Sequence, residues 1–492
     1  MIRAMISSHR SDLSAVRTDY SCNIEFSYGS FCCVSTAAET SVFAYFYIFF
    51  FVTFWKMCTF GARLTSTNCC LMDSNCSHKV LKRIFLAFLM SVLPLFAVAQ
   101  SGAGTVSALV ELGFENVSWA ESGSERVYVV ENVAYRVSGV GIGVALDEIQ
   151  KHGLPEEGKI CRLIVLDNNV PMVSLYCKVP HGKDVARKDW NVSYDLDGSW
   201  ELVKREKRYN SSLFKTDLLI YPEFSFRNSR LSVPYQVRLN MNPTLQVSLW
   251  RGGRLNAQLV IPVVNDYGYK YDDVRPGFLT VEHTVRLPYN VFVTGTVGFF
   301  NNNRSGVDLR AEWHPSGQKF WFDGRVSWTV WGEWGEWEYY NGVKNIHPFK
   351  YGYSMDEAKV TGMLGVNYYL EKFNTQFAGS VESFLGGDCG FRFDMIRHFR
   401  NCSIGFYGTY IPSDWWNSGV NAGFRFQITL PPYKYRRNGY VPRVMPSRNW
   451  GFSYNAGGAF VYGQRFRADI DDNISNNIQY NPSYIKQELL NF

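Results

Sequence analysis

The sequence contains no hydrophobic run of the ~20 residues that a membrane-spanning helix needs. Two apolar stretches, Val42–Trp55 and Ile84–Phe96, both fall short of that length. The mean hydropathy of the chain is only −0.16. These features exclude a helical membrane protein. The net charge of +6 is small and forms no long basic run, so no nucleic-acid partner is predicted.

The chain also has little that could support catalysis. It carries 8 histidines, and no Ser–His–acid spacing or metal-binding motif can be recognised around them. A hydrolase or a metal enzyme would need such a constellation. We therefore expect no enzyme, no catalytic residues, no cofactor and no metal site.

Cysteine is scarce after the first 76 residues, which hold 7 of the 11 cysteines. The basic residues Lys79, Lys82 and Arg83 then precede the apolar run to Phe96, and Ala97-Val98-Ala99 follows. This order is typical of a secretory signal peptide, so we predict one over 79–99 with cleavage between Ala99 and Gln100. Residues 1–78 are then expected to be an upstream segment outside the mature protein, and a membrane-anchored leader is the alternative.

Aromatic residues are abundant, at 16% of the chain, and they alternate with polar ones. In Val307–Trp313 the apolar side chains at odd positions alternate with Asp308, Arg310 and Glu312, which is the pattern of a strand with one dry face. A soluble sandwich would turn the apolar face inward, whereas a membrane barrel would turn it toward lipid. About fourteen strand candidates follow residue 216, most of ~9–12 residues, a length that favours the barrel over the ~5–6 residues common in sandwiches.

The predicted fold is therefore mainly β. A single antiparallel outer-membrane β-barrel of about 12–14 strands occupies 216–492, in contact with outer-membrane lipid. Two of its candidate strands are Leu231–Asn240 and Thr244–Trp250. The long loops expected over Asn265–Arg275 and Trp331–Glu357 would then fall on the periplasmic side, where barrels usually keep short turns. Either the first segment does not cross and Ile474–Phe492 adds a last strand, or the barrel is atypical.

A small periplasmic α+β domain is predicted over 105–180, with the order ββαββ, followed by a linker over 181–215. Cys161 and Cys177 flank a hairpin turn and would face each other, so a disulfide is possible in an oxidising compartment. The run Gly139–Gly143 resembles a phosphate loop only superficially, because the rest of a dinucleotide-binding unit is missing.

Charged residues on the polar strand register form the candidate lumen. They would contact a polysaccharide or, on the plainer interpretation, pair with each other across neighbouring strands. The set comprises Arg238, Glu282, Arg286, Asp308, Arg310, Glu312, Asp323, Arg325, Arg392, Asp394 and Arg425, together with Glu382. Candidate sugar-stacking residues, which could equally form an interfacial girdle, are Trp331, Trp334, Trp337, Tyr339 and Tyr340. Trp415 and Trp416 invite the same two interpretations.

Several short motifs, in order, resemble the YjbH/GfcD exopolysaccharide (capsule) proteins. They are Leu112–Val117, Val130–Asn132 with Tyr135-Arg136, Arg275–Phe278, Arg286–Pro288, Gly298–Asn301 and Arg304–Asp308. The resemblance covers roughly 105–330. The predicted mature chain is shorter than the long members, and it lacks the lipid-attachment cysteine that some members carry.

The resemblance implies an outer-membrane protein with a periplasmic domain that takes part in export or surface assembly of exopolysaccharide. Its partners would be a polysaccharide and other exopolysaccharide-export proteins, and it would act as a conduit or accessory. Two alternatives remain open from the sequence: a general porin or small-solute channel, and a structural barrel that anchors a periplasmic interaction domain.

Overall fold

The computed structural model describes residues 102–490 apart from short gaps at 183, 228–234, 269–270, 341–342, 413–418, 433, 448–449, 456–462 and 471–477. The predicted signal peptide with Ala99 and Gln100, the segment 1–78, and Trp415 and Trp416 lie outside the described residues. Side chains of 335–348 lie outside them as well, so Trp337, Tyr339 and Tyr340 are placed only as backbone.

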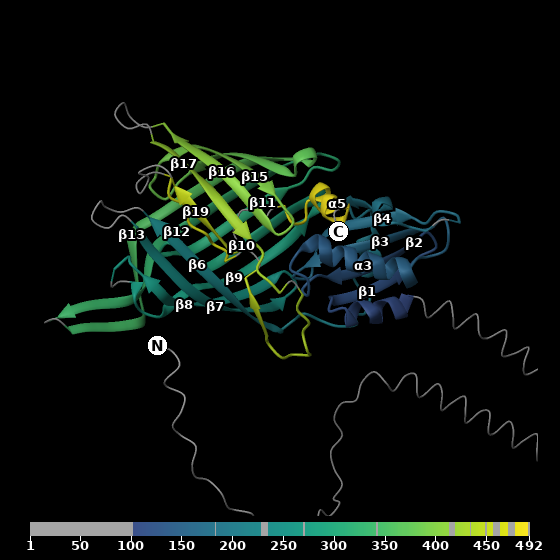
Figure 1. The fold of residues 1–492 in the computed structure, drawn as a ribbon, viewed down its shortest axis with the longest axis horizontal. Coiled ribbons are helices and arrows are strands. Elements are labelled where there is room, and N and C mark those ends of the chain that lie inside the picture. Colours follow the sequence, from purple (N-terminus) through teal and green to yellow (C-terminus); the bar gives the residue numbers. More distant parts are fainter. Residues whose placement is uncertain are drawn as a thin grey trace, which may run out of the picture. The chain divides into compact units, whose positions relative to one another are not determined.

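Residues 102–203 form an α+β domain around a five-stranded sheet (Figure 1). The strands lie side by side in chain order: β1 (Glu115–Glu121), β2 (Glu125–Glu131), β3 (Ile160–Asp167), β4 (Val170–Lys178) and β5 (Asn191–Ser193). Only β2 and β3 run parallel, and α3 (Ser138–His152) makes the crossover between them. This is the order ββαββ that the sequence indicates.

Both faces of this sheet are covered. On one face the helix 102–111 and α3 pack against the strands, and the core includes Leu109, Phe114, Ile142, Leu146 and Leu163. On the other face Val203, from α4 (Ser199–Val203), covers Val127, Ile164 and Leu166. Residues 181–215 are thus not a plain linker: besides α4 they contribute η1 (Arg187–Asp189), β5 and the fully buried Trp190.

The glycines of α3 allow other side chains to approach the helix closely. A Cβ atom at Gly139 would lie 2.3 Å from the Cβ of Glu488, and one at Gly141 would lie 2.5 Å from the Asn132 side chain. Gly139–Gly143 lies inside the helix, so these residues form no loop that could cradle a phosphate.

Cys161 and Cys177 occupy directly opposed positions on β3 and β4, as the hairpin predicts. Both are buried free thiols in the structure, so the possible disulfide is not formed.

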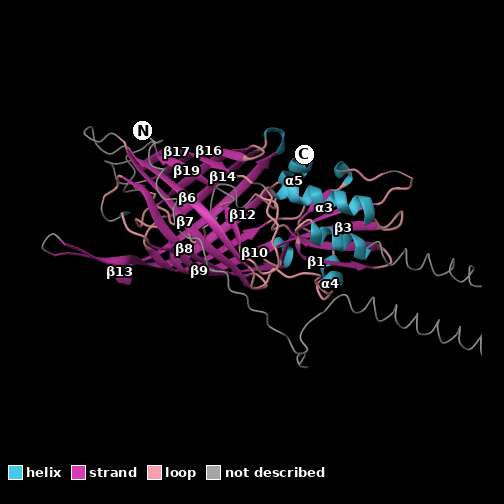
Figure 2. Cartoon of the chain, turned by 60° about the horizontal axis from the view of Figure 1, so that its bottom comes forward, coloured by secondary structure: helices cyan, strands magenta, loops and turns pink. Residues whose placement is uncertain are grey.

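Residues 216–455 form a second sheet of 14 strands (Figure 2). Its order is β18-β6-β7-β8-β9-β10-β11-β12-β13-β14-β15-β16-β17-β19, and every pairing is antiparallel except the parallel one between β18 and β6. The strands are β6 (Thr216–Arg227), β7 (Gln236–Trp250), β8 (Gly253–Asn265), β9 (Arg275–Leu287), β10 (Val291–Phe300), β11 (Arg304–Trp313), β12 (Phe320–Tyr340), β13 (Val343–Leu370), β14 (Thr375–Ser383), β15 (Cys389–His398), β16 (Cys402–Ile411), β17 (Gly419–Ile428), β18 (Arg443–Pro446) and β19 (Trp450–Asn455).

The sheet curls until its two edges lie beside each other. β18 pairs with the first part of β6, and the ring of Phe452 on β19 lies 5.7 Å from the ring of Phe224 on β6. Tyr454 lies 6.3 Å from Phe226 in the same way. The curled sheet therefore has an interior face and an outward face.

The structure differs from the predicted strands in several places, and these differences decide at which end of the sheet each connection lies. Gln236–Asn240 of the first predicted strand and all of Thr244–Trp250 belong to the single strand β7, whereas 231–234 lie outside the described residues. The strand β18 was not anticipated. The predicted loop Trp331–Glu357 is instead a strand hairpin, the outer part of β12 and β13, which extends past the rest of the sheet (Figure 1). Of the possible last strand Ile474–Phe492, the described residues 478–490 contain no strand, and they include α5 (Pro482–Leu490).

With β7 as one strand, the connections alternate between the two ends of the sheet. The end next to the α+β domain, which we name the proximal end, has the short turns Arg251-Gly252, η3 (Pro288–Asn290) and η4 (Glu371–Phe373), and also the long connection 429–442. The connection 266–274 and the β12–β13 hairpin lie at the opposite, distal end. The expected conflict over loop sides thus disappears.

The C-terminal part of the chain is described over 463–470 and 478–490, and residues 463–470, which we name the inner segment, lie in the interior of the sheet. Phe466 stacks on Phe300, and Ile470 packs with Leu219 and Tyr221 on another wall. Farther along, Ile478 packs against Trp321. The chain then leaves the interior as α5, whose Ile485 and Leu489 complete the core of the α+β domain.

Among the described residues, no helix is long and apolar enough to cross a membrane.

Candidate functional site

The two faces of the curled sheet have the reverse of the usual polarity. On β15 the side chains of Phe391 and Phe393 are 55% and 53% exposed, whereas those of Arg392 and Asp394 are buried in the interior. The same alternation continues on β11, where Leu309 is 51% exposed and Asp308 is buried. Polar and charged groups therefore line the interior, which makes it the candidate site.

Most interior charges are paired with each other. Arg392 donates to Asp394 at 2.7 Å, and Arg425 also donates to Asp394. Arg325 donates to Asp308 at 2.5 Å, and it faces Arg310 directly across the strand pair. Asp323, which faces Glu312, accepts from Asn367 at 2.7 Å. Arg325, Arg392 and Arg425 thus bind carboxylates, as the plainer interpretation expects. Arg310 and Asp323, in contrast, face a residue of like charge across the strand pair.

Two cavities remain on either side of the inner segment. The proximal cavity, of about 250 Å³, lies between the α+β domain and the sheet. The predicted residues that line it are Glu282, Asp308, Arg310 and Glu312. The distal chamber, of about 580 Å³, borders the turn Asn301–Asn303 at the distal end, and the predicted residues that line it are Arg238, Arg425 and Trp334.

Arg286 has a different role from the one predicted. Its guanidinium donates to the backbone carbonyls of Pro171, at 2.9 Å, and of Tyr194 in the α+β domain. It therefore holds the domain to the proximal end and does not contact the lumen. Arg254 and Arg443 act similarly: Arg254 bridges Asp167 and Glu282, both at 3.2 Å. Arg443 donates to Asp217 at 2.7 Å and to the Val133 carbonyl at 2.8 Å.

Glu131, one of the residues that carry the family resemblance, lies at the edge of the proximal cavity. Its carboxyl accepts the backbone N–H groups of Asn168 and Asn169 at 3.1 and 3.0 Å and the side-chain amide of Asn116. Burial, together with the nearby Asp167, raises the pKa of this carboxyl to about 7. The group thus holds two segments of the domain together.

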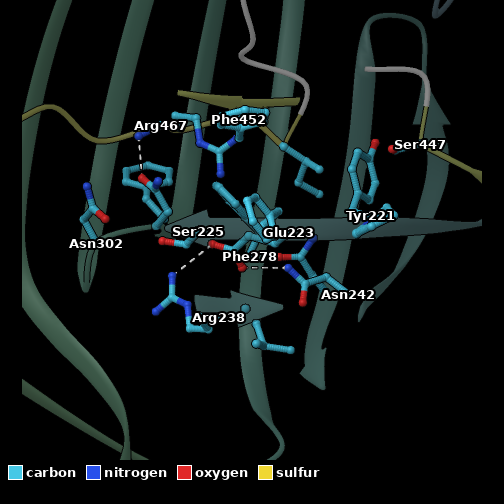
Figure 3. Close-up of a pocket in the computed structure, with 18 of the residues that line it drawn as sticks. Tyr221, Glu223, Ser225, Arg238, Asn242, Phe278, Asn302, Ser447, Phe452 and Arg467 are labelled. Atoms are coloured by element: carbon cyan, nitrogen blue, oxygen red, sulfur yellow. Dashed lines mark hydrogen bonds and ion pairs between the residues drawn. The ribbon is translucent and has the colours of Figure 1, made fainter. Parts of the chain in front are cut away.

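The distal chamber is organised around Glu223 on β6. Its carboxyl accepts from Arg238 at 3.3 Å and from Asn242 at 3.1 Å (Figure 3). It also accepts from Asn240 at 3.0 Å. Glu223 was not among the predicted residues, although the alternation of Glu223 and Ser225 with Phe224 and Phe226 marks the same period-2 pattern.

Further residues of the chamber were missed because they lie outside clear strand patterns. Arg275 stands at the first position of β9, and Arg467 lies on the inner segment. Aromatic rings on the chamber walls include Tyr221, Phe278 and Phe452 (Figure 3). No regularity of the sequence indicates that Arg467 reaches this wall.

The predicted sugar-stacking aromatics separate in the structure. Trp334 lines the distal chamber, and its ring lies 5.0 Å from Tyr351 and 5.6 Å from Phe299. Trp331 is half-buried on β12, opposite Ser354.

Within the described residues, no group of three or more His, Cys, Asp or Glu side chains could hold a metal ion. No family model, curated protein or solved structure matches this chain.

Proposed function

We propose that residues 216–492 form an outer-membrane β-barrel with the α+β domain in the periplasm. Its role would be to bind exopolysaccharide during export or surface assembly, as an accessory and not as a catalyst. The observation that carries the proposal is the reversed polarity of the curled sheet.

An apolar outward face of this extent is unfavourable in water. Large apolar side chains are 37–75% exposed along the sheet, among them Leu364, Val326 and Val420. Each exposed apolar Å² costs about 25 cal/mol in water, and soluble monomers rarely expose patches above a few hundred Å². Contact with lipid removes this cost, while the interior charges stay paired or hydrated, as in known barrels.

Strand length and loop placement support the same orientation. The strands from β8 to β11 have 10 to 13 residues, enough for a tilted strand to cross the apolar layer. Barrels of this class keep short turns on the periplasmic side and longer connections outside. Most connections next to the α+β domain are short turns, with 429–442 as the exception, so this end would face the periplasm.

The polysaccharide role depends on the distal chamber and on the resemblance to the YjbH/GfcD proteins. The chamber combines amide and guanidinium groups with aromatic rings, which suits a hydroxyl-rich ligand. A constantly open porin is less well supported, because the segment 463–470 occupies the interior. The anchoring role is the second candidate, favoured by Arg254, Arg286 and Arg443, which join the domain to the sheet.

The membrane placement is tested by substituting Leu309→Arg, at an outward position in the middle of β11. Arginine facing lipid near the midplane costs ~2–4 kcal/mol, so this variant should be depleted from the outer membrane and should lose heat-modifiable gel mobility. Val441→Arg is the matched control, since Val441 is 62% exposed but lies in a proximal connection. If Leu309→Arg behaves like the control, the outward face contacts water, and the membrane proposal fails.

A further inference from the structure

A rim of exposed aromatic and basic side chains borders the outward face of the large sheet at its proximal end. Its aromatic rings, all 37–49% exposed, are those of Phe320, Tyr368, Phe373 and Phe399. Phe320 on β12 is directly opposite Tyr368 on β13. The turn η4, which contains Phe373, lies beside the end of β15, because Asn374 and His398 are joined by two hydrogen bonds of 2.9 and 2.7 Å. The four rings therefore lie on neighbouring strand ends.

Two basic side chains of this rim bind no carboxylate within the described part of the chain. Arg397 follows the outward register of β15, on which Phe393 and Met395 are also exposed. Its guanidinium lies 5.5 Å from the ring centre of Phe399, and the ammonium of Lys372 lies 5.4 Å from the ring centre of Phe373. Each cation is thus placed beside a ring and left open to an external anion.

The charge balance of the rim is positive. Residues 319–320, 368–375 and 397–401 contain one carboxylate, that of Glu371, and four basic side chains, those of Lys319, Lys372, Arg397 and Arg400. The carboxylate is already used, because Glu371 pairs with Lys319 at 3.3 Å. The excess charge of the rim therefore attracts anions.

In the proposed membrane orientation this rim lies where the apolar outward face meets water. Aromatic rings are common at that depth, and lysine and arginine there extend their charged groups toward the lipid headgroups. Arginine can bind a phosphate through two parallel hydrogen bonds, and lysine binds it as a point charge. Away from the rim, the outward face continues with the exposed apolar side chains of Val366, Met395 and Ile404. A positive edge beside an apolar face matches a lipid with an anionic headgroup.

We infer that the rim formed by β12–β16 at the proximal end is a binding site for an anionic phospholipid. The headgroup phosphate binds Lys372 and Arg397, the rings of Phe373 and Phe399 lie at the level of the glycerol, and the acyl chains lie along the apolar outward face. This inference rests on the proposed function, because only a sheet placed in a membrane presents this edge to lipid.

The test uses the full-length protein in micelles of a neutral detergent. The probe is pyrene-labelled phosphatidylglycerol, and energy transfer from the tryptophans of the protein reports its binding. Unlabelled phosphatidylglycerol should displace the probe on the order of tenfold more effectively than phosphatidylcholine, which carries a phosphate but no net charge. The double substitution Lys372→Gln/Arg397→Gln should abolish this preference, whereas Lys372→Arg/Arg397→Lys, which keeps both charges, should retain it.

Lys151→Gln/Lys178→Gln is the matched control. It removes two exposed lysines from the α+β domain, at the end of α3 and at the end of β4. Equal displacement by the two lipids, or the same loss of preference in the control and in Lys372→Gln/Arg397→Gln, overturns the inference. Displacement by inorganic phosphate as effective as that by phosphatidylglycerol also overturns it, because the site would then bind a free anion.

The failure of this inference can be told apart from the failure of the membrane placement. Lys372 and Arg397 are exposed, so the substituted proteins should keep their heat-modifiable gel mobility. A protein that stays in the outer membrane but shows no preference for the anionic lipid contradicts only the lipid site. Loss of the membrane placement itself is measured separately, with Leu309→Arg.

Discussion

Glu488 should make the attachment of the C-terminal helix depend on pH. Its carboxyl accepts the backbone N–H of Gly139 at 2.8 Å, at the start of α3. The first turn of α3 contains no acidic residue, and Val137 provides no side-chain cap. Glu488 therefore caps a helix 349 positions away in the chain. The residue is 8% exposed, and burial raises the pKa of its carboxyl to about 7.

The direction of the pH effect follows from which form of the helix, docked or undocked, binds the proton of Glu488 more tightly. In the undocked helix the carboxyl returns to a pKa of 4.5, so between pH 4.5 and 7 the docked form binds the proton more tightly. Docking is then strongest below pH 4.5, weakens as the pH rises toward 7 and levels off above that. At 1.36 kcal/mol per pKa unit the full difference is about 3 kcal/mol. The hydrogen bond from Gly139 lowers the pKa, and the value of about 7 already includes it.

Hydrogen exchange of the amides of Ile485–Leu489 measures this difference. After correction for intrinsic exchange, protection in the wild type should fall on the order of 100-fold between pH 4.5 and 8. In Glu488→Gln the amide oxygen can still accept from Gly139, but nothing titrates, so the profile should be flat. Glu111→Gln, at an exposed position of the helix 102–111, should follow the wild type. A wild-type profile without pH dependence, or a Glu488→Gln profile with the same slope, would refute the reasoning.

Two further substitutions test how the sheet is built and how the domain is held. Arg286→Ala removes charged hydrogen bonds to Pro171 and Tyr194, each worth about 1.5–3 kcal/mol, so limited trypsin digestion should release the α+β domain several times faster. An unchanged digestion rate would show that Arg286 does not hold it. Gly252→Ala places a Cβ 2.1 Å from the carbonyl oxygen of Thr284 at a φ of +76°, so the folded, heat-modifiable band should be largely lost. Normal yield of that band would contradict the β7–β8 turn.

The period-2 pattern predicted most of the large sheet because each strand separates an apolar face from a polar one. The pattern failed where a local turn signal conflicted with the hydrogen-bonded pairing of the strands. Asn242-Pro243 is a strong turn signal, but Pro243 lies within β7 opposite Ile220, so the strand continues through it. The polar alternation was found, but whether each charge is paired depends on contacts between strands, which a single strand pattern does not contain.

The chamber was only partly predictable for the same reason. Arg238 and Arg425 follow the strand pattern, whereas Arg467 reaches the wall from a segment with no secondary-structure period. Nor could the sequence show that Ile485 and Leu489 join the core of a domain that begins more than 300 residues earlier. An amphipathic helix indicates that it has a partner, but not which one.

The path of the C-terminal segment restricts the order in which the molecule can be assembled. The N-terminal domain lacks part of its apolar core until α5 arrives, and α5 arrives through the interior of the sheet. The domain therefore cannot reach its final stability while the chain is still being synthesised. Either the sheet curls around the segment or the segment passes into a sheet that has already curled, and the first route avoids threading a helix past Phe466 and Trp321. A completed core in the N-terminal domain would then indicate that α5 has reached its final position.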